Sequence, residues 1–218
     1  MNVCWLLEPR AFEDLLRLVG EDRREKALAL RLAQDRALSL GAGLLLNFAL
    51  AREGRPWPPR VRLGRYGKPA LTGPDAPRFN LSHAGEYAVC AIGCAEVGVD
   101  IERIGPADAS VARRCFTPAE LKRVMPDEAR VDAAAFCLLW AMKESFIKRI
   151  GTGLTLDPLD VEVLDGRPPR VRGQAARACG FWRYGALPGY ELALCASDGH
   201  FPERVDIVGP AALLTALT

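Results

Sequence analysis

Lysine and histidine are scarce in this sequence. Its 218 residues include 29 basic side chains, but only five of these are lysines, and there are only two histidines. Arginine supplies most of the positive charge, so a lysine at a particular place indicates a need for a compact ammonium rather than a planar guanidinium. The 27 acidic residues leave a net charge of +2. A charge this small does not predict binding to nucleic acid.

Long apolar runs are also absent. No stretch approaches the ~20 apolar residues that span a bilayer. The N-terminal segment MNVCWLLEPR lacks the basic start and apolar run of a secretory signal. The seven cysteines are odd in number and scattered, which is typical of reduced, buried thiols. Cys90 and Cys94 are four residues apart, but neither His83 nor His200 has the spacing to complete a zinc site. We expect a cytoplasmic protein without a membrane segment.

A strand, a turn and a second strand are predicted between residues 79 and 92. The segment FNLSH ends the first strand, and the turn at 84–86 leads into an apolar second strand. Ser82 and His83 point to opposite faces of a strand, so they cannot form a nucleophile and its base. Because the chain also has no GxSxG elbow, a serine hydrolase is excluded. His83 is either a hydrogen-bonded structural residue or a ligand-binding one.

Two carboxylates share one face of the clearest predicted strand, VGVDIE at residues 97–102. Apolar residues alternate with Gly98, Asp100 and Glu102, so the two carboxylates stand about 7 Å apart on the same face. Like charges this close repel each other unless a cation lies between them, and hard oxygen ligands suit Mg²⁺. The alternative is the solvent-exposed face of an edge strand.

A helix is predicted over residues 136–150, FCLLWAMKESFIKRI, and the glycines at 151 and 153 end it. Trp140, Glu144 and Lys148 are four residues apart and project from nearly one face. Apolar residues occupy the opposite face. Glu144 and Lys148 therefore form either an ordinary ion pair on the helix surface or part of a site.

Helices and antiparallel strands are expected in both halves of the chain. Residues 21–52 are predicted to be helical, either as two helices or as one helix whose Gly41 and Gly43 contact a neighbour. Further helices should begin at the caps Thr117 and Asp132. Further strands are predicted at 154–164, 167–173, 181–184 and 190–196, followed by a surface tail at 201–218. The segment GEYAVCA in the first half resembles GYELALCA in the second, which favours two similar α+β lobes, at 1–105 and 106–218.

Three of these units, in this order, resemble the 4′-phosphopantetheinyl transferases of the surfactin-synthetase-activating type. They are FNLSH at 79–83, VGVDIE at 97–102 and LWAMKESFIKRIGTGL at 139–154, with YGKP at 66–69 and FTPAE at 116–120 as weaker support. The resemblance implies a monomeric enzyme of α+β fold, with its two lobes related by a pseudo-twofold axis. It further implies transfer of 4′-phosphopantetheine from coenzyme A to a serine of an acyl or peptidyl carrier protein, releasing 3′,5′-ADP, with Mg²⁺ as cofactor.

The resemblance also implies roles for individual residues. Asp100, Glu102 and Glu144 would coordinate Mg²⁺, Glu144 would also be the general base, and Lys148 would stabilise charge at the reacting phosphorus. The residues expected to contact coenzyme A are Arg31, Arg36, Gly67, Lys68, Pro69, Ser82, His83, Lys143 and Lys148. Lys143 points about 100° away from Glu144 and can equally pair with a neighbouring carboxylate. The surface expected to meet the carrier protein includes Arg113, Arg114, Phe116 and Lys122.

Two alternatives follow from the same residues. One is a different Mg²⁺-dependent phosphate-handling enzyme, such as a nuclease or pyrophosphohydrolase, built on the three carboxylates. The other is a non-catalytic module that binds coenzyme A or a carrier protein.

Overall fold

The structure is a computed structural model that describes residues 2–5, 15–127, 130–163, 170–171 and 179–218. One sheet has the order β11-β1-β5-β4, and it consists of β1 (Asn2–Trp5), β4 (Arg78–Ala84), β5 (Tyr87–Gly93) and β11 (Asp206–Val208). A second sheet has the order β6-β10-β9, and it consists of β6 (Val97–Arg103), β9 (Gly180–Tyr184) and β10 (Tyr190–Ala196). Two short antiparallel pairs are formed by β2 (Val61–Leu63) with β3 (Pro69–Leu71) and by β7 (Val161–Glu162) with β8 (Arg170–Val171).

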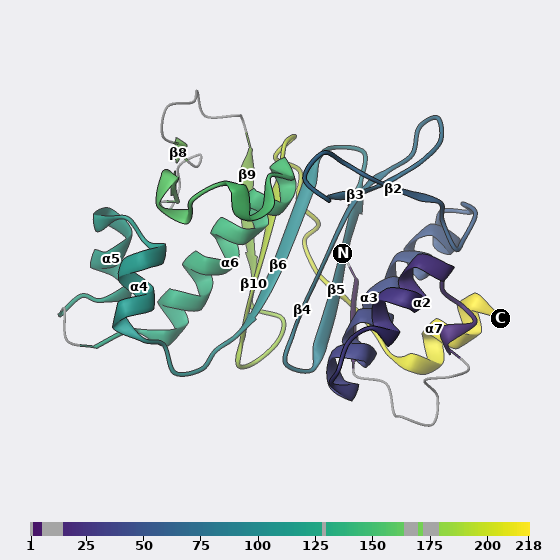
Figure 1. Ribbon diagram of the computed structural model, residues 1–218, viewed down its shortest axis with the longest axis horizontal. Coiled ribbons are helices and arrows are strands. Elements are labelled where there is room, and N and C mark those ends of the chain that lie inside the picture. The colour runs from purple at the N-terminus through teal and green to yellow at the C-terminus, as the bar shows by residue number, and fades with distance from the viewer. Residues whose placement is uncertain (1, 6–14, 128–129, 164–169, 172–178) are drawn as a thin grey trace.

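Helices flank the strands on two sides (Figure 1). The helices beside the first sheet are α2 (Glu21–Leu28), α3 (Ala33–Arg52) and α7 (Pro210–Leu217). Those beside the second sheet are α4 (Ala109–Cys115), α5 (Pro118–Val124) and α6 (Ala133–Ile150). Within the described ranges, no helix combines the length and the apolar character needed to cross a membrane. Helices packed on mostly antiparallel strands confirm the predicted α+β class.

Residues 21–52 form two helices, which was one of the two alternatives. The break lies at residues 29–32, and Gly41 and Gly43 are buried in the middle of α3. A Cβ on Gly43 would lie 2.8 Å from Cγ of Arg23, so this glycine lets α2 pack closely against α3. The buried leucines of α3 join Phe79 and Cys90 of the first sheet in one apolar cluster.

The two sheets meet where β4 lies beside β6 (Figure 1). No backbone ladder joins these strands among the described residues; instead, the side chain of Asn80 accepts a hydrogen bond from the Val99 amide at 2.8 Å. The two segments with similar sequences, β5 and β10, contact each other through Tyr87 and Tyr190, whose rings meet edge to face at 4.9 Å. A pseudo-twofold axis relating the lobes stays a prediction.

Gly98 brings α6 directly onto β6. A Cβ at this position would lie 2.0 Å from the Ser145 carbonyl oxygen and 2.4 Å from the Arg149 amide nitrogen, so only glycine fits. Because residues i and i+2 of a strand share a face, Asp100 and Glu102 also face α6. β6 is the edge strand of its sheet, but Asp100 is only 3% exposed, so the alternative of a solvent-exposed face is wrong. The contact between β6 and α6 is what places the strand carboxylates beside Glu144.

Two expectations for the second half need correction. Residues 154–160 form 3₁₀ turns at Gly153–Thr155 and Pro158–Asp160 rather than a strand, and β7 begins only at Val161. Pro158 at the start of the second turn favours that conformation. Position 164 and most of 167–173 lie outside the described residues.

The end of the chain is not a surface tail. β11 pairs in parallel with β1, and α7 packs against α3 with Leu213 and Leu217 buried. The chain therefore returns to the sheet of its first half, where apolar surface of α3 is covered. The proposed division at residue 105 stays a prediction. In sequence, β11 and α7 belong to the second part, 106–218, but in space they pack on β1 and α3 of the first part.

Candidate active site

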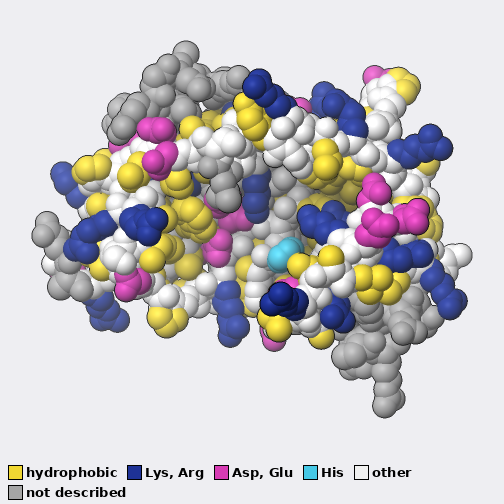
Figure 2. Space-filling model, viewed as in Figure 1, with side chains coloured by type: hydrophobic (Ala, Val, Ile, Leu, Met, Phe, Trp, Pro, Cys, Tyr) yellow, Lys and Arg dark blue, Asp and Glu magenta, His cyan; other side chains and the backbone are white. Residues whose placement is uncertain are grey.

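A cleft of about 270 Å³ opens between β4, β6 and α6. We call it the carboxylate cleft, and its lining residues are Leu81, Ser82, His83, Asp100, Ile101, Glu102, Trp140, Glu144 and Lys148. Acidic and basic side chains lie side by side in the middle of this face of the molecule (Figure 2). The three motifs FNLSH, VGVDIE and LWAMKESFIKR thus each contribute to one cleft.

Helix α6 presents three side chains to the cleft. Asp132 caps the helix by accepting hydrogen bonds from the amides of residues 134 and 135, and Gly151 ends it with a φ of 74°. Between these ends, Trp140, Glu144 and Lys148 line the cleft at intervals of one turn, as their spacing predicts. Glu144 and Lys148 therefore line a cleft rather than an ordinary helix surface.

Asp100 lies at the centre of a hydrogen-bonded triangle. Its Oδ1 accepts hydrogen bonds from Ser82 Oγ at 2.7 Å and from Lys148 Nζ at 2.5 Å, and Lys148 Nζ also donates to Ser82 Oγ at 2.9 Å. The side chain of Asp100 is 4% exposed, whereas that of Lys148 is 28% exposed. Asp100 is therefore buried in the floor of the cleft, whereas part of the Lys148 side chain is exposed to solvent.

Negative charge in the cleft exceeds the positive charge that Lys148 supplies. The other oxygen of Asp100, Oδ2, is buried and has no hydrogen-bond partner. Burial, followed by the neighbouring charges of Asp100 and Glu144, raises the pKa of Glu102 to about 7. Burial and the charge of Asp100 also raise the pKa of Glu144. Three carboxyl groups thus compete for one ammonium.

The raised pKa of Glu102 gives a stability test. Between the ordinary pKa of 4.5 and about 7, the native state holds a proton that the unfolded state has lost, so the free energy of unfolding falls as the pH rises. Glutamine cannot ionise. We expect metal-free Glu102→Gln to exceed the wild type in stability by roughly 1–2 kcal/mol at pH 8 and by less at pH 5.5. Urea denaturation in the presence of a chelator measures this difference, and a variant less stable than the wild type at pH 8 would contradict it.

The donor chemistry of the cleft suits a divalent cation. Carboxylate oxygens are the ligands that Mg²⁺ prefers, and the unpartnered Asp100 Oδ2 is a buried acceptor in need of positive charge. In the part of the chain that the structure describes, however, no three His, Cys, Asp or Glu side chains are arranged to hold a metal ion as they stand. Lys148 occupies the other oxygen of Asp100. The donor atoms of Asp100, Glu102 and Glu144 therefore suit a divalent cation. In this structure, the positive charge next to Asp100 is the ammonium of Lys148.

Basic residues of α2 add positive charge near His83. Desolvation and the charge of Lys148 lower the pKa of His83, and Lys26 and Arg23 contribute in the same direction. The neutral imidazole can donate one hydrogen bond to an anion. Gln34 fastens the adjoining turn by donating to the Gly85 carbonyl oxygen at 2.7 Å. Among the basic residues between positions 23 and 36, Arg23 and Lys26 are therefore close enough to influence His83 electrostatically.

Lys68 lies in a second pocket of about 420 Å³, next to the end of α6. We call it the basic pocket, and its charged lining residues are Arg62, Arg65, Lys68, Arg78, Glu96 and Arg149. The Lys68 ammonium donates to the Arg149 carbonyl at 2.7 Å and to Glu96 Oε2 and the Val97 carbonyl at 3.2 Å each. Pro69 lines the same pocket, and Gly67 forms the turn before it with a φ of 83°. Lys68 therefore holds β6 and α6 together and does not reach the carboxylate cleft.

Lys143 does not face the cleft. Its side chain is fully buried on the opposite side of α6, where Nζ contacts Glu120 at 2.8 Å and donates to the carbonyls of Cys115 and Pro158 at 2.8 Å each. One residue of helix turns the side chain by about 100°, which separates Lys143 from Glu144. The expected coenzyme A contact is therefore not available to Lys143, and the alternative of pairing with a carboxylate holds.

Arg31 and Arg36 are not brought to the cleft either. Arg36 donates to the carbonyls of Leu30 and Arg31, at 2.7 and 3.3 Å, and so closes the loop between α2 and α3. Arg31 is exposed in that loop. Neither arginine lines the carboxylate cleft or the basic pocket. Loop carbonyls compete successfully for the guanidinium because they lie within a few residues of it.

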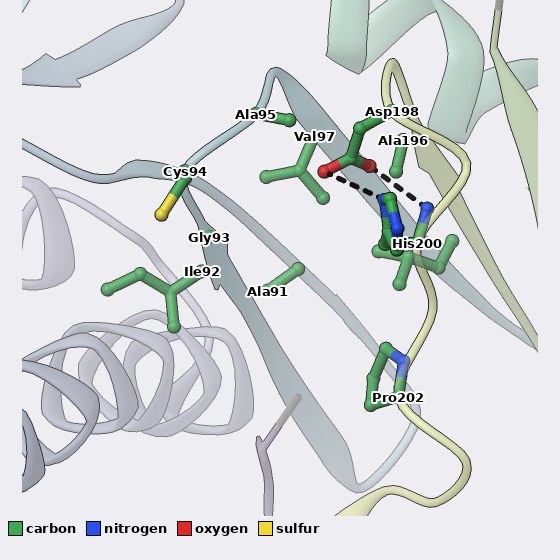
Figure 3. A pocket seen from close by; sticks show the side chains of 11 residues that line it. Ala91, Ile92, Gly93, Cys94, Ala95, Val97, Ala196, Asp198, His200 and Pro202 are labelled. Carbon is green, nitrogen blue, oxygen red and sulfur yellow. Dashed lines mark hydrogen bonds and ion pairs between the residues drawn. The ribbon is translucent and has the colours of Figure 1, made fainter.

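A further hollow of about 80 Å³ contains His200, the second histidine (Figure 3). His200 donates its backbone amide to Asp198 Oδ1 at 3.0 Å, and its Nδ1 lies 3.7 Å from Asp198 Oδ2. Cys94 lies at the other end of the hollow (Figure 3). Cys90 is buried in the core and Cys94 is exposed, and no metal-binding group involves them among the residues described.

Some lining residues were not identified from the sequence. Trp140 projects from the same face of α6 as Glu144 and Lys148, as its spacing predicts, but its place in the lining of the carboxylate cleft was not predicted. The arginines of the basic pocket, Arg62, Arg65 and Arg78, flank the YGKP segment, and their density around it was an available signal. The basic residues of α2 are Arg23, Arg24 and Lys26, and the sequence does not show which of them lie near His83.

Comparisons with known proteins show which family the chain resembles. The family model of the 4′-phosphopantetheinyl transferase superfamily matches residues 96–195. The chain is 31% identical over 210 residues to the 4′-phosphopantetheinyl transferase Sfp of Bacillus subtilis (strain 168), covering 93% of this chain and 92% of the relative. It is 32% identical over 208 residues to the 4′-phosphopantetheinyl transferase ffp of Bacillus subtilis, covering 92% of each. The solved holo-[acyl-carrier-protein] synthase of Thermotoga maritima matches 46% of this chain and 61% of its own, with a TM-score of 0.37 and 21% identity.

Proposed function

The chain belongs to the 4′-phosphopantetheinyl transferase superfamily, and on this premise we propose that its carboxylate cleft transfers 4′-phosphopantetheine from coenzyme A to a serine of an acyl or peptidyl carrier protein. The observation that supports this cleft is the Ser82–Asp100–Lys148 triangle facing Glu102 and Glu144. It places an ammonium, a hydroxyl and three carboxyl groups in one hollow, which are the groups that hold a pyrophosphate and accept a proton.

The transfer exchanges one phosphorus–oxygen bond for another. The hydroxyl oxygen of the carrier serine attacks the phosphorus that carries the pantetheine arm. A new bond forms between that oxygen and phosphorus, the bond to the bridging oxygen of the pyrophosphate breaks, and 3′,5′-ADP leaves. The serine proton must pass to a base, and the charge on the departing phosphate must be stabilised.

Glu144 is the proposed base. It lines the cleft one helical turn from Lys148, and its pKa is raised by burial and by the charge of Asp100. A raised pKa makes a carboxylate a stronger proton acceptor near neutral pH. Lys148 is the group best placed to hold a phosphate oxygen, because its ammonium is partly exposed while Asp100 and Ser82 fix its direction.

Asp100, Glu102 and Glu144 are the residues that would hold Mg²⁺, which when bound supplies positive charge to the pyrophosphate oxygens. The unpartnered Asp100 Oδ2 and the raised pKa values of Glu102 and Glu144 support this set. Each of the three can carry a negative charge, and the single ammonium of Lys148 cannot neutralise all of them.

Two walls of the protein near the cleft are candidates for binding the remaining parts of coenzyme A. Arg23 and Lys26 present positive charge near the imidazole of His83, at the outer end of β4. The basic pocket lies next to the end of α6 and offers Arg65, Arg78 and the flat ring of Tyr66. We propose that the nucleotide end of coenzyme A lies against these walls, with Gly67 and Pro69 shaping the approach to the pocket.

The carrier protein is proposed to meet the enzyme on the side of α4 and α5. Arg113, Arg114 and Lys122 are exposed there, whereas Phe116 is buried in the core of this unit and contacts Phe136. Carrier domains are acidic, so the exposed cations favour this face. Phe116 supports the surface from below rather than forming part of it. Action as a monomer in the cytoplasm stays a prediction.

The transfer assay tests the function directly. Incubation with coenzyme A, Mg²⁺ and an apo-carrier protein should add the mass of phosphopantetheine to the carrier and release 3′,5′-ADP, both measured by mass spectrometry. Release of nucleotide without any acceptor would favour a pyrophosphohydrolase instead. Binding of coenzyme A with no mass gain on a panel of acyl and peptidyl carriers would favour a non-catalytic module.

A further inference from the structure

The ammonium of Lys148 is hydrogen-bonded to two other side chains of the carboxylate cleft. An ammonium has three donor positions. Lys148 donates to Asp100 Oδ1 at 2.5 Å and to Ser82 Oγ at 2.9 Å, and Ser82 in turn donates to the same Asp100 oxygen at 2.7 Å. The ion pair therefore occupies the deepest carboxylate of the cleft and is supported by a third side chain.

The same carboxylate is needed by a cation. A divalent ion shared by Asp100, Glu102 and Glu144 would sit next to the Lys148 ammonium, and two positive charges this close oppose each other. No three His, Cys, Asp or Glu side chains among the described residues are arranged to hold a metal ion as they stand. Asp100 Oδ2 nevertheless remains without a partner, so the site keeps one oxygen for an incoming charge.

Lys148 is also the member of the pair that can move. Its side chain is 28% exposed and carries four flexible methylene groups, whereas the Asp100 side chain is 4% exposed on a paired strand. A phosphate group entering the cleft can draw the ammonium toward itself without disturbing β6. That movement would lower the positive charge at Asp100 and leave its Oδ1 with the Ser82 hydroxyl as its remaining side-chain donor.

We propose that Lys148 is an internal counter-ion that competes with the divalent cation for Asp100, so that the metal site is completed only when a phosphate ligand takes Lys148 away. This inference rests on the proposed function, because it assumes that Asp100 takes part in cation binding. It makes the affinity for the cation depend on the phosphate ligand and, by linkage, the affinity for the phosphate ligand depend on the cation. The protein alone would then bind the cation weakly.

Replacing Lys148 by methionine tests the competition in the absence of coenzyme A. We expect Lys148→Met to bind Mn²⁺ about tenfold more tightly than the wild type, because the competing charge is removed from Asp100. Mn²⁺ serves as the probe for Mg²⁺, and free Mn²⁺ is counted by its electron paramagnetic resonance signal. Lys148→Gln, which is neutral but keeps a donor for Asp100, should shift the affinity in the same direction by a smaller factor.

Lys26→Met is the matched control, since it removes the same charge from a position near His83 without touching Asp100. Its Mn²⁺ affinity should change by less than about twofold. Equal tightening in Lys26→Met and Lys148→Met would show a general charge effect and overturn the proposal. Unchanged or weaker Mn²⁺ binding in both Lys148 variants, with circular dichroism spectra like the wild type, would also overturn it.

The two proposals fail separately. Mn²⁺ binding requires neither a carrier protein nor turnover, so a negative result here leaves the transfer assay to decide the function. Absence of Mn²⁺ binding in the wild type and in both Lys148 variants would reject this inference, even for a protein that transfers phosphopantetheine.

Discussion

Glu144→Gln is expected to reduce the rate of carrier modification by at least about 10³-fold, because it removes both the proposed base and one cation ligand while keeping the size of the side chain. Glu144 lines the cleft beside Asp100 and Lys148, and none of the ion pairs found among the described residues includes it. The folded structure should therefore persist. Single-turnover transfer to an apo-carrier protein, followed by mass spectrometry, measures the loss.

Glu203→Gln provides the matched control, because Glu203 is exposed in the segment before β11 and lines neither pocket near α6. It should transfer at the wild-type rate. A Glu144→Gln enzyme that keeps a rate within tenfold of the wild type would remove Glu144 from the chemistry. Asp100→Asn should also be nearly inactive, since it removes the charge that Lys148 and the cation share.

Lys143→Met is expected to destabilise the protein by about 3–5 kcal/mol, because it leaves the carboxylate of Glu120 buried without its cation. Both side chains of this pair are 0% exposed. Glu120 Oε2 accepts the amide hydrogen of Thr117 at 2.7 Å, and Oε1 accepts that of Val163 at 2.8 Å, so the pair connects α5, α6 and β7. Urea denaturation of the variant and the wild type measures the loss.

The same variant separates a structural role from a substrate contact. Because Lys143 lies on the far side of α6 from the cleft, the KM for coenzyme A of the folded Lys143→Met enzyme should equal that of the wild type. A KM raised more than about tenfold, with stability unchanged, would restore the coenzyme A contact expected from the sequence. The double variant Lys143→Met/Glu120→Gln should recover part of the lost stability, since the buried charge is then removed together with its partner.

Local periodicity determined much of the site from sequence alone. The alternation in 97–102 placed Asp100 and Glu102 on one face, and the four-residue spacing in α6 placed Glu144 and Lys148 on one side. Thr117 and Asp132 cap their helices as their sequence context predicts, with a complete capping box at Thr117. These features depend on residues within a few positions of one another, so they can be derived without the fold.

Tertiary structure decided the partner of each charge. Lys148 pairs with Asp100, 48 residues away, and Lys143 pairs with Glu120 across the opposite face of the same helix. Lys68 reaches the carbonyl of Arg149, 81 residues away, instead of the cleft. The spacing of lysines along α6 fixes their directions but not which segments pack on either side, because that depends on burial of apolar surface from distant parts of the chain. The sequence alone therefore predicted which residues of three motifs project from shared faces, whereas packing determined which cations face the carboxylates and which support the helix that carries them.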